Sequence, residues 1–103
     1  MGAYVDVAGV EDVPAGAGLH VCIAGVDIVL FNVDASIHAV ADACLIDGAP
    51  LSGGVVRGRV VSCTRHRGQY DIVTGELVGV SGLRIERFPL RVIDGRILVD
   101  VEG

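Results

Sequence analysis

The 103-residue sequence contains no lysine and no tryptophan, and aromatic residues make up only 4% of it. A folded core must therefore be built mainly from Val, Ile, Leu and Ala. All eight basic residues are arginines, and the formal net charge is −5. Binding to a phosphate backbone needs clustered positive charge. We therefore exclude nucleic acid as a partner and expect a protein partner with a basic surface.

Long hydrophobic runs are also missing. No apolar stretch approaches the ~20 residues that a membrane-spanning helix requires, so no membrane partner is expected. The first residues lack the basic region, apolar run and cleavage site of a secretory signal. Three cysteines, an odd number, do not form a closed disulfide framework. These absences favour a reducing compartment, and the cytoplasm is the expected location.

The residues that are present favour short β-strands in a single domain, residues 1–103. Apolar residues make up 51% of the chain, and fifteen glycines indicate many tight turns. No window shows a 3.6-residue apolar period over three turns, whereas β-branched runs recur between turn residues. The expected strands are 3–8, 19–23, 27–33, 37–41, 55–56, 59–62, 69–73, 88–93 and 96–101. The sequence therefore predicts an all-β fold, a small sandwich or barrel.

Two cysteine segments stand out from this pattern. Cys44 opens a segment rich in glycine and proline, residues 42–58, which we interpret as an ordered loop. Cys63 and His66 form a Cys-x-x-His motif directly after an expected strand. This spacing lets a thiolate and an imidazole bind one metal site. If the two loops pack tip to tip, Cys44, Cys63 and His66 come together.

The chain resembles the Rieske-type [2Fe–2S] ferredoxins. The resemblance rests on Cys44, Gly48-Ala49-Pro50-Leu51-Ser52, Cys63-Thr64-Arg65-His66, Tyr70-Asp71 and Thr74-Gly75. It implies a Rieske-like β-sandwich with two cluster-binding loops at one end. It also implies a [2Fe–2S] cluster held by two cysteines on one iron and two histidines on the other. Such a protein is an electron carrier rather than an enzyme, and its partner is an oxygenase or reductase component.

In this family pattern one ligand position is altered. Cys44 and Cys63 fall on the cysteine positions and His66 on the second histidine position, but Ile46, which has no donor atom, occupies the first. Asp47 is the neighbour best placed to supply a carboxylate donor. His38 is a second candidate, although the alternation around it is typical of a strand side chain.

Three interpretations of this altered site remain open. The chain could bind a [2Fe–2S] cluster with an incomplete or altered ligand set. It could bind a single ion such as Zn²⁺ through Cys44, Cys63, His66 and Asp47. It could also be a cluster-less structural or regulatory module that keeps the fold.

Four further residues carry expectations. Arg65 and Arg67 flank His66 and are either partner contacts or solvated loop residues. Tyr70 is either a core aromatic residue or a hydrogen-bond partner of a cluster cysteine, which would tune its potential. Cys22, in the expected strand 19–23, is predicted to be a small buried apolar residue.

Overall fold

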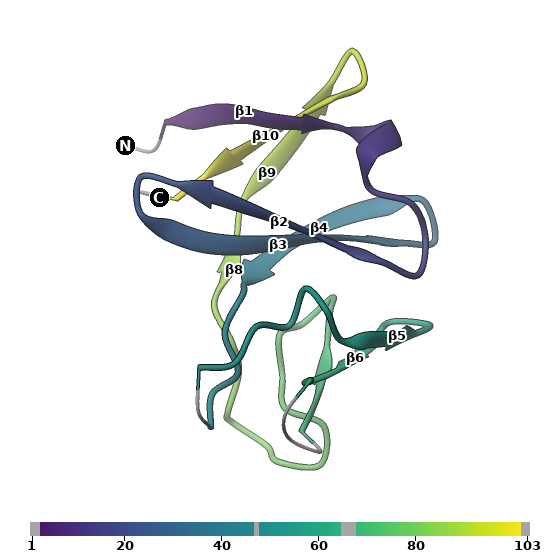
Figure 1. Cartoon of the computed structure of the whole chain (residues 1–103), viewed down its shortest axis with the longest axis vertical. Coiled ribbons are helices and arrows are strands. Elements are labelled where there is room, and N and C mark those ends of the chain that lie inside the picture. The colour runs from purple at the N-terminus through teal and green to yellow at the C-terminus, as the bar shows by residue number, and fades with distance from the viewer. Residues whose placement is uncertain (1–2, 47, 65–67, 102–103) are drawn as a thin grey trace.

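The structure, a computed structural model, describes residues 3–46, 48–64 and 68–101. Its regular structure is almost entirely β-strand, as predicted (Figure 1). The elements are β1 (Tyr4–Gly9), η1 (a 3-10 helix, Val10–Asp12), β2 (Gly18–Ile23), β3 (Val26–Val33), β4 (Ser36–Ala41), β5 (Val55–Arg57), β6 (Val60–Ser62), β7 (Gln69–Asp71), β8 (Arg87–Phe88), β9 (Leu90–Ile93) and β10 (Arg96–Asp100). The described residues contain no helix that is long and apolar enough to cross a membrane.

The strands form three antiparallel sheets, with the orders β1-β10-β9, β2-β3-β4-β8 and β5-β6-β7. In Figure 1 the first two sheets lie one above the other, and the third lies below them among long loops. The first two sheets enclose one core, to which Ala8, Ile97 and Val99 contribute from above. The β5-β6-β7 sheet and the loops pack on the opposite face of the middle sheet.

Strand β3 is buried on both faces, which explains its nearly continuous apolar sequence. Ile28 and Leu30 point into the core between the two upper sheets. Val29 and Phe31 alternate with them and point into the lower core, which also contains Cys44 and Cys63. The middle sheet is thus the common wall of both cores, and it fixes the position of the lower loops.

Tight two-residue turns connect the hairpins. Asp94 and Gly95 have φ values of 51° and 77°, and Asp34 and Ala35 have 51° and 67°. Positive φ at both central residues is the conformation that matches the twist of a two-residue hairpin. The turn at Ala35 has additional support, because its N–H donates to the side chain of Asn32 at 3.1 Å.

Two local predictions were wrong. Residues 88–93 were expected to form one strand, but the chain breaks at Pro89 and passes from the middle sheet to the upper one. Proline has no N–H to donate to a neighbouring strand, so it interrupts the pairing where the chain changes sheets. Cys22 was expected to be buried but is exposed. It lies on β2, at the edge of the middle sheet, where the lower core does not cover the strand.

A close backbone approach joins the first loop to the lower sheet. A Cβ atom on Gly54 would collide with the carbonyl oxygen of Ser62, the last residue of β6, and would lie 3.1 Å from the carbonyl oxygen of Leu51. The N–H of Gly54 also donates to that Leu51 oxygen at 2.9 Å. The absence of a side chain at position 54 therefore lets the first loop lie against the strand that leads to Cys63.

We expect Gly54→Ala to lower the free energy of unfolding by about 1–3 kcal/mol, as overpacking against a rigid backbone does. Gly53→Ala is the matched control, because its new Cβ would only meet a Thr64 methyl group at 3.5 Å. Urea unfolding of both variants measures the difference. Equal stability of the two variants would show that the loop shifts at no cost.

Candidate functional site

The first loop begins after β4 with Asp42, and its far end is hydrogen-bonded to the carboxylate of Asp42. Asp42 is buried, and its Oδ1 accepts the N–H groups of Leu51 at 2.6 Å and Ser52 at 2.8 Å. Its own N–H donates to the carbonyl oxygen of Asp27 at 3.0 Å. Asp42 thus ties both ends of the loop to the middle sheet, a role that the sequence analysis did not assign.

Cys44 lies within a closed turn of this loop. Its N–H donates to the carbonyl oxygen of Ala49 at 2.8 Å, and its carbonyl oxygen accepts the N–H of Gly48 at 2.9 Å. Gly48 has a φ of 77°, which a residue with a side chain rarely adopts. The turn buries Cys44 but leaves Ile46 60% exposed, so the cysteine points inward and the isoleucine outward.

The second loop closes on itself and touches the first. The N–H of Cys63, also buried, donates to the carbonyl oxygen of Gly68 at 2.9 Å. The hydroxyl group of Thr64 donates to the carbonyl oxygen of Pro50 in the first loop at 3.2 Å. The prediction that two cysteine loops pack together at one end of the fold is confirmed.

The hydroxyl group of Tyr70 lies between the two loops. It is 3.2 Å from Cys44 Sγ and accepts the N–H of Leu45 at 3.0 Å. Because an amide N–H can only donate, the hydroxyl hydrogen is available to the sulfur atom. Tyr70 is fully buried, so it is both a core aromatic residue and the partner of a candidate ligand.

The environment keeps this hydroxyl group protonated. Burial, followed by the hydrogen bond to Cys44 and the charges of Cys44 and Cys63, raises the pKa of Tyr70 to about 12, whereas the Leu45 hydrogen bond acts in the opposite direction. A phenol with a raised pKa remains a hydrogen-bond donor across the physiological range. A thiolate at position 44 therefore keeps a donor directed at it.

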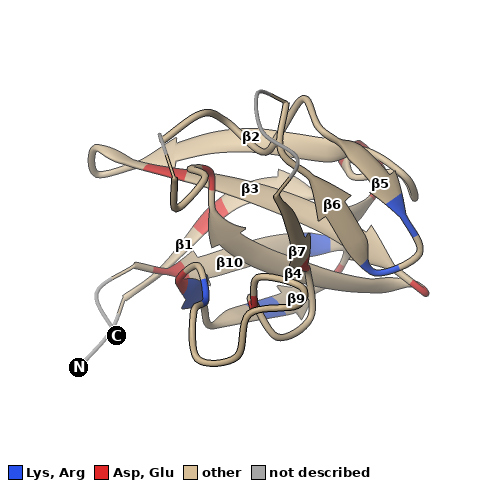
Figure 2. Cartoon of the chain, turned by 90° about the horizontal axis from the view of Figure 1, so that it is seen from below, with Lys and Arg blue, Asp and Glu red and all other residues tan. Residues whose placement is uncertain are grey.

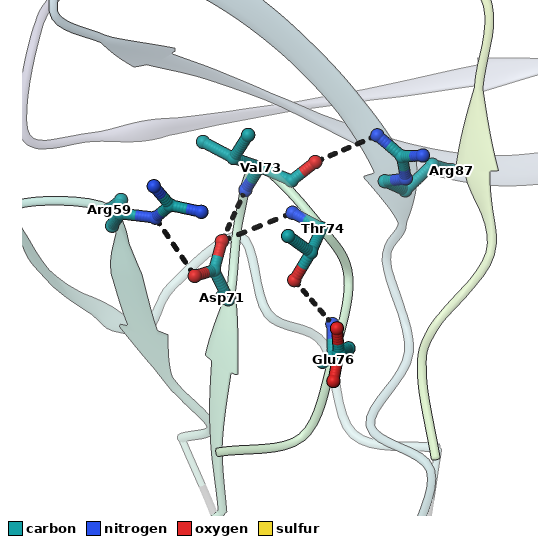
Figure 3. A network of polar contacts seen from close by, with 6 residues as sticks. All are labelled: Arg59, Asp71, Val73, Thr74, Glu76 and Arg87. Carbon is teal, nitrogen blue, oxygen red and sulfur yellow. Dashed lines mark hydrogen bonds and ion pairs between the residues drawn. The ribbon is translucent and has the colours of Figure 1, made fainter. Parts of the chain in front are cut away.

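A polar network fixes the turn that follows Tyr70 (Figure 3). Asp71 accepts the N–H of Val73 at 2.8 Å and of Thr74 at 3.1 Å, and it accepts Arg59 Nε at 2.8 Å. Arg87 Nη1 donates to the carbonyl oxygen of Val73 at 2.8 Å. Burial works to raise the pKa of Asp71, but its bonds to Arg59 and the two amides outweigh it and hold the pKa below the usual value.

His38 lies within electrostatic reach of this network. Burial first, and then the charges of Arg87 and Arg59, lower the pKa of His38, which also feels the charge of Asp71. Within 3–46, 48–64 and 68–101, no three His, Cys, Asp or Glu side chains are grouped so as to hold a metal ion. The role of His38 as the replacement ligand stays a prediction, because His66, with which it would share an iron, lies outside the described residues.

The described residues fit half of the expected ligand set. Two buried cysteines on adjoining loops, one with a hydroxyl donor at its sulfur atom, suit an iron held by thiolates. Ile46 does not fit the other iron, because its side chain has no donor atom and points toward solvent. His66, Asp47, Arg65 and Arg67 lie outside the described residues.

The fold and the paired cysteine loops define a small all-β protein with two cysteine loops at one end. The Rieske [2Fe-2S] domain family matches residues 3–89, and the chain belongs to this family. It is 28% identical over 100 residues to the ferredoxin component of the naphthalene 1,2-dioxygenase/salicylate 5-hydroxylase systems of Ralstonia sp., a match that covers 96% of each chain.

Two solved structures illustrate the range of similar proteins. A putative NADH-dependent nitrite reductase small subunit from Mycobacterium tuberculosis superimposes with a TM-score of 0.88, at 24% identity, over 100% of this chain and 98% of the other. A chain from a complex of reduced oxygenase and oxidized ferredoxin in carbazole 1,9a-dioxygenase gives 0.84, at 25% identity, over 94% and 92%. The fold predicted from the sequence is thus confirmed.

The raised pKa of Tyr70 predicts a pH dependence of stability. In the folded protein this group holds its proton up to pH about 12, whereas an unfolded tyrosine releases it near pH ~10. The corresponding stabilisation is complete below pH ~10 and is lost as the pH rises toward 12. Tyr70→Phe lacks this titration, but it leaves the Leu45 N–H without a partner, which costs about 1–3 kcal/mol.

We therefore expect Tyr70→Phe to be less stable than the parent at pH 8, with a gap that narrows between pH 10 and 11. Urea unfolding of both proteins across this range measures the gap, and all other titrating groups are shared by the two chains. A gap that stays constant with pH would contradict the assigned protonation.

Proposed function

We propose that this protein carries single electrons as the ferredoxin component of an oxygenase or reductase system. The observation that carries the proposal is the placement of Cys44 and Cys63, buried on two touching loops, with the Tyr70 hydroxyl group at one sulfur atom. Membership of the Rieske family supports it, as does the similarity to a protein named as the ferredoxin component of a dioxygenase system.

We propose that Cys44 and Cys63 hold one iron of a [2Fe–2S] cluster, which when bound supplies reversible one-electron chemistry. His66 is the proposed ligand of the second iron. Asp47, beside the position taken by Ile46, is the proposed replacement donor, since carboxylate oxygen is an acceptable ligand for iron. The resulting set of two thiolates, one imidazole and one carboxylate is altered, because it gives the second iron one imidazole where the family pattern gives two.

The proposed partner is a larger protein redox component, and the proposed location is the cytoplasm. The net charge of −5 suits a partner with a basic surface. Cys22 is exposed, and the three cysteines form no disulfide bond with one another. Cysteines stay reduced in this way where glutathione and thioredoxin are present, as in the cytoplasm.

A cluster-less binding module is the second candidate, and Ile46 favours it. A side chain without a donor atom, 60% exposed, gives no support to metal binding at that position. One similar structure is named as a putative nitrite reductase small subunit, so a subunit role suits this fold too. The two candidates differ in colour, because a protein with a bound [2Fe–2S] cluster absorbs visible light and an empty one does not.

Ile46→His tests the ligand count directly. The substitution restores two cysteines and two histidines, so we expect more iron and sulfide per chain after anaerobic reconstitution than in the parent. The gain should disappear in the double variant with His66→Ala, because the second iron again lacks a donor. Iron and sulfide assays, together with the visible absorption spectrum, measure the occupancy.

The other outcomes separate the remaining interpretations. A parent that already holds a full cluster, and loses it in Asp47→Ala, would establish the carboxylate as the fourth donor. Zinc without sulfide would indicate a single-metal site on the same residues. Neither metal in the parent nor in Ile46→His would refute the electron carrier and leave the cluster-less module.

A further inference from the structure

Exposed apolar side chains gather around the two cysteine loops. Leu45, Ile46, Val78, Val80 and Leu83 are between 43% and 60% exposed. We call these five residues the apolar rim. Scattered single apolar residues are normal on a surface, but a contiguous patch of them marks a site of interaction. Whether the rim is contiguous is therefore the first question.

Contacts around Gly68 join the two parts of the rim. A Cβ atom placed on Gly68 would lie 3.8 Å from Cδ1 of Ile46 and 3.7 Å from Cδ1 of Leu77. Ile46 of the first loop and Leu77, at the start of segment 77–83, therefore both lie against Gly68 of the second loop. The glycine leaves room for both apolar side chains to approach.

Segment 77–83 is held by hydrogen bonds beside β7. The N–H of Leu77 donates to the carbonyl oxygen of Leu83 at 2.9 Å, and the N–H of Val78 donates to that of Gln69 at 2.8 Å. The N–H of Val80 donates to the carbonyl oxygen of Leu77 at 3.1 Å. These bonds use backbone atoms only, which leaves the side chains of Val78, Val80 and Leu83 facing outward.

The rim is also nearly free of charge. Residues 77–83 and 48–54 contain no acidic or basic side chain. In Figure 2, which views the molecule from the loop end, arginines colour several segments, among them the turn between β5 and β6. Arg57 and Arg59 occupy that turn, at the end of β6 opposite Cys63. The charged residues of the loop tips in the sequence, Asp47, Arg65 and Arg67, lie outside the described residues.

We infer that the apolar rim is a docking face for an apolar surface on the larger redox partner, and that Ile46 serves this contact instead of metal binding. The identity of the partner rests on the proposed function. A partner that exchanges electrons must approach Cys44 and Cys63. The rim adjoins both loops, because Ile46 lies near Gly68, whose carbonyl oxygen accepts the Cys63 N–H. A second copy of the chain on this face would block that approach. Apolar interface centres with few charges are typical of specific protein complexes.

The chain offers a matched control for a test of this inference. Leu83 on the rim and Ile93 on β9 are both 51% exposed, but Ile93 lies on the upper sheet, which the loop end does not include. A photo-crosslinking amino acid, benzoylphenylalanine, is placed at position 83 or at position 93 in the native host. Mass spectrometry identifies the adducts, and the captured protein is then purified for binding measurements.

We expect an adduct with a larger redox component from position 83 and none from position 93. With the purified partner, Leu83→Ser and Ile46→Ser should each raise the Kd about tenfold, the scale of losing one well-buried interface residue. Ile93→Ser should leave the Kd unchanged. Added salt should change the Kd of Leu83→Ser and of the parent by the same factor, because screening acts on charges and not on apolar contacts.

Three results would overturn the inference: no adduct from position 83, an adduct with the chain itself, or equal effects of Leu83→Ser and Ile93→Ser on the Kd. The proposed electron transfer is tested separately, by the iron and sulfide content of the protein. A colourless chain that docks through Leu83 keeps the docking face and loses the cluster. A coloured chain that docks elsewhere does the reverse.

Discussion

The hydroxyl group of Tyr70 is the interaction on which the loop end depends. It joins Cys44 and Leu45 of the first loop to the strand that follows the second loop. Without it, the Leu45 N–H and the Cys44 sulfur atom would face a buried apolar ring. Since a donor that loses its partner costs more than a hydrogen bond contributes, the position of Tyr70 constrains the path of the first loop.

The middle sheet makes this arrangement rigid. Because β3 is buried on both faces, the residues that support the loops, Val29 and Phe31, are held by the same strand as the upper core. Asp42 then connects the end of β4 to the far side of the first loop. Loops mounted on a rigid scaffold are where proteins usually place functional groups, and here two short tethers serve that purpose.

The sequence predicted the strands well because alternation and turn residues are local signals. It missed features that depend on distant contacts. The strand pattern of residues 19–23 did not reveal that Cys22 lies at a sheet edge. Nothing near Asp42 showed that its carboxylate accepts amides nine and ten residues later. The sequence also did not show how the two ends of segment 74–86 approach each other. A Cβ atom on Gly75 would lie 2.7 Å from the Ile85 carbonyl oxygen.

The family motif singled out Cys44 and Cys63, which the structure places buried on two adjoining loops, and Ile46 shows where such a motif stops being informative. Among the described residues, no buried side-chain nitrogen or oxygen atom lacks a hydrogen-bond partner. Because Ile46 is exposed, its side chain also contributes little to the core. A side chain at this position can therefore either bind a cofactor or contact a partner protein. An isoleucine, which has no donor atom, can only contact a partner.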